Sequence, residues 1–526
     1  MNMRVAKAIL GAAVLCATFS VQAANRPSGY VTICTEGKTC SVATSTNVAF
    51  GRADQFFYKT LTGSFVCNEA TFGGRVGGGV NECSAPSGTS ASSAAASSAA
   101  SSKASSSVAS SVASSVASSI SSSKASSSVA SSVASSVSSS VASSISSSVA
   151  SSSGSTSWPA STATRPQLSD AVAANYDVAQ FLASAGTLGS LVTDNWNPRN
   201  TVVQMPASPT YTVAKSGGTH TTIQAAIQAA TLSGVTTRQY IKVMPGTYNE
   251  LVIVPQGPTI SLYGGGTDPS QVVIALPTAA KLTGAQYAAL GNPGGTVFTS
   301  STPSSIKATY DACAGKSGSI GTTCSSLFVV TGDNFEASNL TIQNTYDEGG
   351  GESQAVALMV VGDRNIFNKV RLLGNQDTLY VKTTALTVVA RSYFVNSFIE
   401  GDTDFIFGRG TAVFDNSQIN FTRVRKSSST IAAPSTATSN PYGFLFTRCV
   451  FTVDAGAATV SFARQWPESS SSGGTIGKVI IRESNISAYI QNPPWAAWSS
   501  SNPVQYGTAS SPYLAEYHNT GDGAAK

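Results

Sequence analysis

The sequence predicts an all-β fold, a parallel β-helix in which short strands stack coil upon coil. Three motifs that place a carboxylate or carboxamide beside apolar residues recur at the period of such a solenoid: Gln354 and Asp377 lie 23 positions apart, and Asp377 and Asp404 lie 27 apart. Short alternating runs there follow a turn-prone Asn that predicts a corner, at Asn339, Asn368, Asn396 and Asn416. Because neighbouring coils stack about 4.8 Å apart, the three motifs are expected to converge on one lateral patch.

The chain begins with a segment, 1–23, that predicts a signal peptide. Arg4 and Lys7 precede an apolar run that ends near Phe19, and small residues around Ala23 form a cleavage site. This run is too short to span a bilayer, and no later run is long and apolar enough to do so. We therefore expect a secreted, extracellular protein without membrane contact once the signal is removed.

Residues 24–83 predict a small β module held by disulfides. An even number of cysteines in a secreted segment of this size indicates two bridges, whose pairing is one of three. The spacing lacks the tight pairs of a zinc site. The cysteines are Cys34, Cys40, Cys67 and Cys83.

Aromatic residues alternate with small and polar residues in this module. They form either a carbohydrate-binding platform, in which exposed rings stack on sugars, or simply the core of a domain that has little else to bury. These aromatic residues are Phe50, Phe56, Phe57, Tyr58, Phe65 and Phe72.

Residues 84–157 form a Ser/Ala-rich tract that predicts a flexible linker. Its Ser-Ser-Val-Ala units carry almost no charge and cannot bury enough surface to fold. Random-coil scaling gives the tract a mean span of roughly 45–50 Å. Such a reach suits a tether that raises local concentration on an extended substrate.

Residues 158–526 predict the large β-helix domain. Near its start, an apolar stripe at helical spacing runs from Ile223 to Ala230 after a Thr cap, which predicts an amphipathic helix. That helix is expected to cover the open end of the solenoid. Gly246 and Glu250 follow the next strand, and we expect them to have structural roles.

The remaining cysteines and the histidines limit the chemistry of the large domain. Cys313 and Cys324 lie in a Gly/Ser-rich insertion and predict a disulfide that staples it. Cys449 is left over and is expected to be a small buried hydrophobe. The chain has two histidines, His220 and His518, and no Gly-x-Ser-x-Gly elbow. A serine triad is therefore not expected, and a carboxylate must supply the nucleophile for ester hydrolysis.

Five motifs occur in a fixed order along the large domain. They are Gly246-Thr-Tyr-Asn-Glu250, Gln354-Ala-Val-Ala-Leu358, Gln376-Asp-Thr-Leu-Tyr380, Asp404-Phe-Ile-Phe-Gly408 and Arg464-Gln-Trp466. Their order resembles the signature of the pectin methylesterases, the pectinesterases of carbohydrate esterase family 8, in a longer bacterial subgroup. The resemblance covers most of 208–498. It implies a right-handed parallel β-helix and hydrolysis of galacturonate methyl esters in pectin to pectate and methanol, without a cofactor or metal.

The resemblance also implies a role for the polar residues of these motifs. Asp404 is expected to be the nucleophile that forms an acyl-enzyme, and Asp377 to act first as general acid and then as base. Gln376 is expected to stabilise the oxyanion, with Gln354 as a second oxyanion or substrate contact. Arg464 is expected to orient Asp404. The residues expected to bind substrate are Trp466, Tyr380 and Phe405.

The chain departs from the family pattern in two places. Gln465 stands where the family commonly has Pro, and the step from Asp377 to Asp404 is longer than usual, with 383–390 as the expected extra loop. Asp402 is expected to serve in a turn. A basic cluster either binds free carboxylates of the substrate or forms a solvated face; it consists of Arg423, Arg425 and Lys426. Two tryptophans either form sugar subsites or pack against the solenoid; they are Trp495 and Trp498.

The formal charge excludes some partners. It is +5, and it falls to +3 when Arg4 and Lys7 leave with the signal, which is too mild to indicate nucleic-acid binding. We expect a monomer whose partner is pectin. Three other functions were weighed: a non-catalytic polysaccharide-binding β-helix, a pectate lyase, which would need clustered acidic calcium ligands, and an esterase of other specificity such as a thioesterase.

Overall fold

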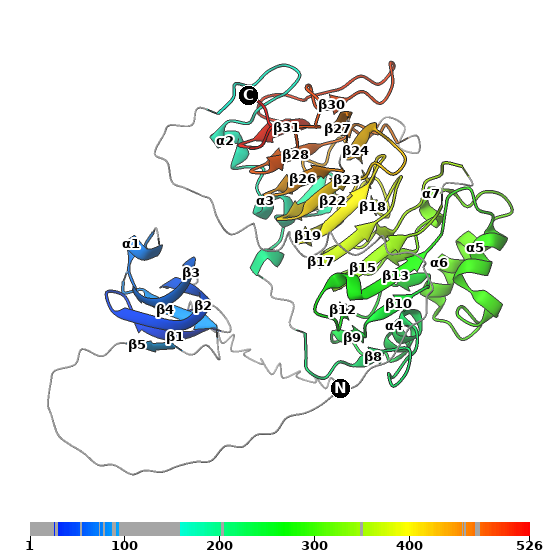
Figure 1. Cartoon of the computed structure of the whole chain (residues 1–526), viewed down its shortest axis with the longest axis horizontal. Coiled ribbons are helices and arrows are strands. Elements are labelled where there is room, and N and C mark those ends of the chain that lie inside the picture. The colour runs from blue at the N-terminus through cyan, green and yellow to red at the C-terminus, as the bar shows by residue number, and fades with distance from the viewer. Residues whose placement is uncertain are drawn as a thin grey trace, which may run out of the picture. The chain divides into compact units, whose positions relative to one another are not determined.

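The computed structural model describes residue 26 and residues 30–52, 55–72, 74–76, 79–86, 91–93, 158–200, 205–347, 351–454, 456, 459–468 and 474–526 (Figure 1). The chain divides into two compact units, 1–146 and 147–526. The predicted signal peptide and most of the predicted linker lie outside the described residues. Within those residues, no helix has the length and apolarity needed to cross a membrane.

The first unit contains a five-stranded antiparallel sheet in the order β1-β4-β2-β3, with β5 paired to β2. Its elements are β1 (Tyr30–Thr35), β2 (Thr39–Arg52), β3 (Gln55–Val66), α1 (Glu69–Phe72), β4 (Glu82–Pro86) and β5 (Ala91–Ser93). The predicted boundary at residue 83 is therefore too early, because β4 continues past it and β5 adds to the same sheet. The boundary was missed because these edge residues have the small, polar composition of the linker.

Two disulfides hold this module together, and the structure settles their pairing as Cys34–Cys40 and Cys67–Cys83. The four sulfurs lie in the core on one side of the sheet. There the Phe50 ring stacks on Phe72 at 5.1 Å between centroids. Part of the aromatic set is thus the module's core, as one of the two interpretations predicted.

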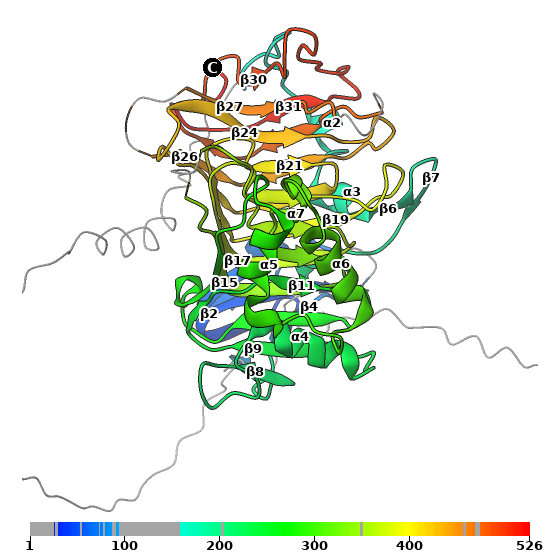
Figure 2. The same ribbon diagram turned by 90° about the vertical axis from the view of Figure 1, so that its right-hand side faces the viewer.

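The second unit is a parallel β-helix, as the motif period predicts (Figure 2). One flank is an eight-stranded parallel sheet: β11 (Val252–Val254), β14 (Phe328–Val330), β16 (Leu358–Val360), β18 (Leu379–Val381), β21 (Ile406–Gly408), β24 (Ser428–Pro434), β27 (Thr459–Arg464) and β30 (Trp495–Ala496). The other two flanks form one bent sixteen-stranded sheet. Its strands are β8 (Tyr211–Val213), β9 (Gln239–Val243), β10 (Gly246–Tyr248), β12 (Ile260–Gly264), β13 (Val272–Leu276), β15 (Glu336–Asn344), β17 (Asn365–Leu373), β19 (Arg391–Val395), β20 (Phe398–Gly401), β22 (Thr411–Asp415), β23 (Gln418–Phe421), β25 (Phe444–Thr447), β26 (Val450–Val453), β28 (Val479–Arg482), β29 (Asn485–Ile486) and β31 (Leu514–Tyr517).

The bend between these two flanks is made by residues in the left-handed region. Asn339, Asn396 and Asn416 have φ values of 54°, 51° and 47°, which confirms the predicted corners. In the coil that contains Asn368, however, the corner residue is Lys369, with φ 54°. Asn tolerates this conformation best, but the stacking of coils fixes the position of the corner, and a lysine adopts it when the register demands.

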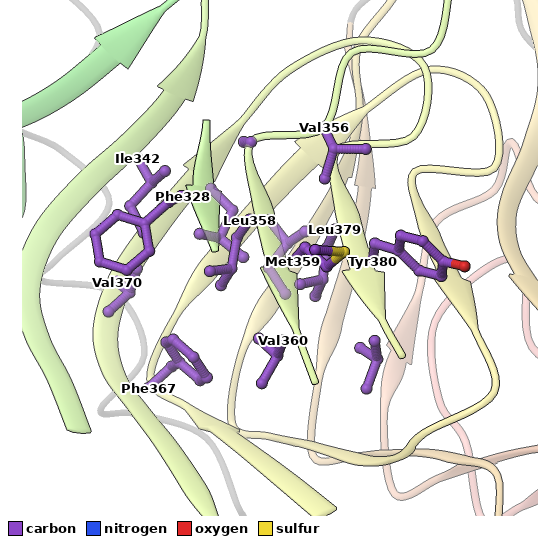
Figure 3. Close-up of a cluster of buried hydrophobic side chains, with 14 of the residues drawn as sticks. Phe328, Ile342, Val356, Leu358, Met359, Val360, Phe367, Val370, Leu379 and Tyr380 are labelled. Atoms are coloured by element: carbon purple, nitrogen blue, oxygen red, sulfur yellow. The ribbon is translucent and has the colours of Figure 1, made fainter. Parts of the chain in front are cut away.

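Stacked side chains fill the interior of the solenoid. Phe335, Phe367, Phe394, Phe414 and Phe446 form a ladder with centroid separations of 6.0, 4.7, 5.0 and 4.6 Å. On the facing sheet, Phe328, Leu358 and Leu379 share one register position in adjacent strands (Figure 3). Each coil thus buries its apolar residues against the coils above and below, which is why the repeats are stable only as a stack.

The predicted helix over 223–230 is α4 (Ile223–Leu232), and it packs on β8, β9 and β11 at the first coils. The Thr222 side chain caps it, and the Glu250 carboxylate accepts hydrogen bonds from the backbone N–H groups of Ile223 and Gln224 at 3.1 and 3.0 Å. A carboxylate at a helix N-terminus is stabilised by the helix dipole. The structural role predicted for Glu250 is confirmed.

Helices and a hairpin decorate the solenoid (Figure 2). The insertion after β13 forms α5 (Gly284–Gly291), η3 (Pro293–Gly295), α6 (Ser304–Ala314) and α7 (Gly321–Cys324), and the predicted Cys313–Cys324 disulfide joins α6 to α7. The other pieces are η2 (Pro269–Gln271) and, in an N-terminal arm, α2 (Asp170–Ala173), α3 (Val178–Ala183), β6 (Ser184–Thr187), β7 (Ser190–Thr193) and η1 (Pro198–Asn200).

The N-terminal arm, residues 158–200, packs on the outside of the sixteen-stranded sheet. Its apolar residues cover Tyr393, Val413 and other outward side chains of successive coils. The Arg391 guanidinium, fully buried beneath it, pairs with Asp194 of the arm and with Asp363, each at 2.7 Å. At the far end, Arg165 pairs with Glu516 of the last strand at 2.6 Å. Buried ion pairs fix geometry, so the arm is held in one register along the stack.

Candidate active site

The polar residues of the three central motifs occupy equivalent places in successive coils of the eight-stranded sheet. Gln354 precedes β16, Gln376 and Asp377 precede β18, and Asp404 precedes β21. The Asp377 N–H donates to the Thr403 carbonyl at 3.0 Å, and the Ala355 N–H donates to the Gln376 carbonyl at 3.1 Å. The predicted convergence of the motifs on one lateral patch is therefore confirmed.

Both aspartates have left-handed backbone conformations, with φ 66° at Asp377 and 46° at Asp404. Asp tolerates this region better than most residues, yet it still costs of order 1 kcal/mol. Such a cost persists only where the surrounding structure determines it. Here the parallel ladder on either side does so, and each carboxyl is projected out of the strand line at the start of its strand.

Arg464, at the end of β27, holds the Asp404 carboxylate with both arms of its guanidinium. The Nε–Oδ1 distance is 2.8 Å and the Nη2–Oδ2 distance is 2.5 Å. Asp404 is 8% exposed and Arg464 30% exposed, so solvent reaches the pair from the arginine side. Hydrogen bonding to Asp404 raises the pKa of Arg464. This two-point contact fixes the plane of the carboxylate as well as its position.

Asp377 has a different environment. It is 7% exposed, and burial raises the pKa of its carboxyl well above the usual range. The negative charge of Asp404 raises the pKa of Asp377 further, whereas Arg464 lowers it. A carboxyl with a raised pKa near an arginine-bound carboxyl is an arrangement that suits a proton donor and a nucleophile.

Gln354 and Gln376 line a hollow of about 470 Å³, and Gln376 is the residue immediately before Asp377. A carboxamide N–H in such a place can donate to a developing negative charge without carrying a charge of its own. The other lining residues come from α7 and the loop before it, from the segment before α5 and from the segment before β16: Ala280, Lys281, Ser319, Gly321, Thr322, Glu352 and Ser353. The disulfide-stapled insertion thus forms one wall of this hollow.

The aromatic residues predicted to bind substrate have different environments. Trp466 is partly buried and lies 6.0 Å from Phe407. Tyr380 is 5% exposed, and its ring stacks on Phe407 at 4.2 Å, so it offers little surface to a sugar. Phe405 is fully buried, and its prediction as a substrate contact is wrong, because its side chain points into the core of the solenoid.

Two aromatic residues near the site were not assigned from the sequence. Phe407 pairs in register with Tyr380 one coil earlier, and aligning the Asp377 motif with the Asp404 motif would have found it. The Trp498 ring lies under the Arg464 guanidinium, 4.4 Å from Cζ to centroid. Trp495, in contrast, is 3% exposed and packs on Phe462 in the core. Of the two tryptophans left open, one is packing and the other supports the arginine.

Two cations of the basic cluster after β23 are paired with carboxylates. Arg425 makes bonds of 2.7 and 2.5 Å to Asp402, which is fully buried. Lys426 pairs with Glu352 at 2.5 Å. Both interpretations of the cluster are therefore wrong for Arg425, whereas Lys426 lies in a surface ion pair, which agrees with a solvated face. The sequence predicts a turn role for Asp402, and the structure shows its fully buried carboxylate paired with Arg425.

The two departures from the family pattern have structural explanations. The Gln465 side chain donates to the carbonyls of Gly477 and Gln505, both at 2.9 Å, so it anchors the chain that follows. The extra loop at 383–390 is paired with the arm: the Leu188 N–H donates to the Thr387 carbonyl at 2.7 Å. That pairing joins the β6–β7 hairpin to the coil between the two aspartates.

In the part of the chain that the structure describes, only one cluster of three or more potential metal ligands occurs. It consists of the four cysteines of the module, which are joined in the two disulfides. Cys449 is buried and unpaired, as predicted, and burial raises the pKa of its thiol to about 12.

These features define a class of protein: a parallel β-helix that carries an arginine-bound aspartate and a buried aspartate on consecutive coils. Residues 304–526 match the family model named Pectinesterase. A pectinesterase of Ralstonia solanacearum is 41% identical over 388 residues, which cover 69% of this chain and 92% of that protein. A pectinesterase of Sitophilus oryzae is 34% identical and covers 69% and 94%. The chain belongs to the pectinesterase family and is a carboxylic ester hydrolase.

Two solved structures support the same placement. The rice weevil pectin methyl esterase superposes with a TM-score of 0.60 at 33% identity, covering 70% of this chain and all of that one. The Escherichia coli protein YbhC superposes with a TM-score of 0.62 at 33% identity, covering 70% and 99%. In both comparisons the matched part is about the size of the second unit.

Proposed function

We propose that this protein hydrolyses the methyl esters of galacturonate in pectin, giving pectate and methanol, through Asp404 and Asp377. The proposal rests on one observation: two carboxyl groups on consecutive coils have different environments. Arg464 binds Asp404 at two points, whereas burial raises the pKa of Asp377. The first carboxyl is arranged as a nucleophile and the second as a proton donor.

In the first step, a carboxylate oxygen of Asp404 attacks the ester carbonyl carbon. The tetrahedral oxyanion accepts hydrogen bonds from the carboxamide of Gln376, with Gln354 as the second donor in the same hollow. The bond to the methoxy group then breaks, and Asp377 gives its proton to the departing oxygen to form methanol. An anhydride joins Asp404 to the galacturonyl group.

In the second step, water resolves this acyl-enzyme. Asp377, now a carboxylate, takes a proton from water while the oxygen attacks the galacturonyl carbon. Asp404 leaves as a carboxylate, still bound to Arg464, and the product acid ionises in solvent. Asp377 is protonated again at the end of the cycle.

Pectin is the proposed partner, and Trp466 is the proposed wall of the sugar subsite, because its partly buried ring lies 6.0 Å from Phe407, whose ring stacks on Tyr380. We propose that the protein acts outside the cell, since its first 23 residues have the pattern of an export signal. A monomer suffices for this site, since every named group comes from one chain.

The test is methanol release from highly methylated pectin by the purified protein, with EDTA present and ultraviolet absorbance of unsaturated products followed in parallel. Methanol without new absorbance is expected, and Asp404→Ala should remove it while the fold is retained. New absorbance without methanol would mean that the protein is a lyase and not an esterase. If the folded protein gives neither signal, the proposed function becomes that of a non-catalytic polysaccharide-binding β-helix.

A second candidate rests on YbhC, named as an acyl-CoA thioester hydrolase, which is 35% identical over 350 residues. The same aspartate pair could cleave a thioester, because the nucleophile attacks the carbonyl in both cases. Thiol release from acyl-CoA by the wild-type protein, abolished in Asp404→Ala and faster than methanol release from pectin, would favour this specificity.

A further inference from the structure

The small N-terminal module presents a second aromatic surface that its core does not use. Along β3, Phe57 faces the core with Phe50, its partner in β2, so Phe56 and Tyr58 point to the opposite side. Tyr58 is 48% exposed. The Tyr30 and Phe56 rings lie 6.3 and 6.5 Å from the Tyr58 ring, and we name these three rings the aromatic face.

Small residues form the floor of the aromatic face. In register with Tyr58 stands Ala49 of β2, and in register with Ala49 stands Ser84 of β4. The Tyr30 hydroxyl accepts a hydrogen bond from Asn47 of β2 at 3.4 Å, although β4 separates β1 from β2 in the sheet. The Tyr30 side chain therefore extends across β4, where Pro86 is its partner in register. Such a floor lets rings lie close to the sheet with one side open to solvent.

The charged side chains described next to the aromatic face are paired or lie on the core side of the sheet. Arg26 and Glu82 form an ion pair at 3.6 Å, and the Thr32 hydroxyl donates to Glu82 at 2.6 Å. The Lys59 ammonium, also on β3, is bound to the Thr71 carbonyl of α1 on the core side, at 2.7 Å. A polyanion would need free cations here, whereas sugar hydroxyls need rings to stack on and amide or hydroxyl partners at the edge.

We propose that the aromatic face binds a neutral polysaccharide chain of β-1,4-linked pyranoses, a polymer other than the anionic substrate of the esterase. The ring planes of Tyr30 and Phe56 make angles of 78° and 65° with that of Tyr58, so the three rings do not form one flat platform. A flat crystalline surface could stack on one ring at a time. A single chain, which rotates from one sugar to the next, can meet rings of different inclination.

This surface gives the two units of the chain different targets. The serine-rich sequence predicted as a tether would join a module that holds a neutral wall polymer to a domain that modifies pectin nearby. Binding of this kind raises the local concentration of the esterase without occupying its active site. The inference does not depend on the esterase chemistry, since it concerns a surface of the first unit only.

The test is affinity gel electrophoresis of the full-length mature chain in native gels that contain hydroxyethylcellulose, polygalacturonate or no polymer. Hydroxyethylcellulose should retard the wild-type protein. Tyr58→Ala should weaken this binding by roughly tenfold, the effect of losing one stacked ring, and Tyr58→Trp should keep it. Tyr489→Ala, which removes a 37% exposed ring from the second unit, is the matched control and should migrate like the wild type.

Each other outcome overturns the proposal. Absence of retardation by hydroxyethylcellulose would remove the binding function, and retardation that Tyr58→Ala leaves unchanged would place it elsewhere. If polygalacturonate retards the protein and Tyr58→Ala abolishes this effect, the polymer bound by the aromatic face is anionic. Methanol release from soluble pectin should be equal in the wild type and Tyr58→Ala, which separates a failure of this surface from a failure of the esterase.

Discussion

The contact between Arg464 and Asp404 allows a quantitative test of the proposed nucleophile. Arg464→Lys keeps the positive charge but replaces a two-point fork by a single ammonium, so one of the bonds at 2.8 and 2.5 Å is lost. A hydrogen bond between charged groups contributes about 1.5–3 kcal/mol. Since the arginine side chain is 30% exposed, the lower half of that range applies. The expected loss in kcat is roughly 10- to 50-fold.

The assay is initial-rate methanol release from methylated pectin over a range of substrate concentrations. Because Arg464 orients the attacking group, kcat should fall while KM changes little. Arg448→Lys is the matched control: it alters another arginine paired with an aspartate, Asp415, on the sixteen-stranded sheet, and it should leave kcat unchanged. If Arg464→Lys keeps kcat within about twofold of the wild type while remaining folded, the two-point orientation of Asp404 is not what drives attack.

Three further predictions concern other parts of the large domain. Asp377→Asn should remove most turnover. It should also change the pH dependence of stability, because the pKa of Asp377 is raised in the folded state. Protonation of Asp377 stabilises the native state fully below the unfolded pKa of about 3.9, and this contribution is lost as pH rises through the folded pKa. Urea titrations should therefore show the stability of the variant, relative to the wild type, increasing from pH 4 to pH 8, and a constant difference would contradict the buried acid. Trp498→Leu should reduce kcat by roughly 2- to 30-fold through the lost stack on Arg464, with little change in Tm, and unaltered kinetics would make that stack incidental. Glu250→Gln should lower the free energy of unfolding by about 1–2 kcal/mol, by weakening the cap of α4, and leave kcat unchanged; a loss of activity in a stable variant would assign Glu250 to the site.

Those parts of the molecule that repeat could be predicted from the sequence. The coil period followed from the spacing of Gln354, Asp377 and Asp404, because stacking places equivalent residues of successive coils side by side. The choice between neighbouring apolar residues could not be made. Phe405 and Phe407 both follow Asp404, and since the strand is covered on both faces, no alternation of polar residues marks which ring points outward.

Contacts between segments that are distant in the sequence could not be predicted either. The arm residue Asp194 meets Arg391, 197 positions later, and Arg425 takes Asp402 from an earlier coil. Neither pairing has a local pattern, because a charged residue in a short strand or loop has the same sequence appearance whether it is solvated or buried in a pair. The corner lies at Lys369 and not at the predicted Asn368 for a related reason. Turn propensity depends on the residue itself, whereas the position of the corner is set by the register of the whole stack of coils.

The bond between Arg165 and Glu516 joins residues that are 351 positions apart. During synthesis the arm is the first part of the large domain to leave the ribosome, and β31, which binds the start of the arm through Glu516, is almost the last. The domain therefore cannot reach its final form vectorially, coil after coil, and its closing step must wait for the whole chain.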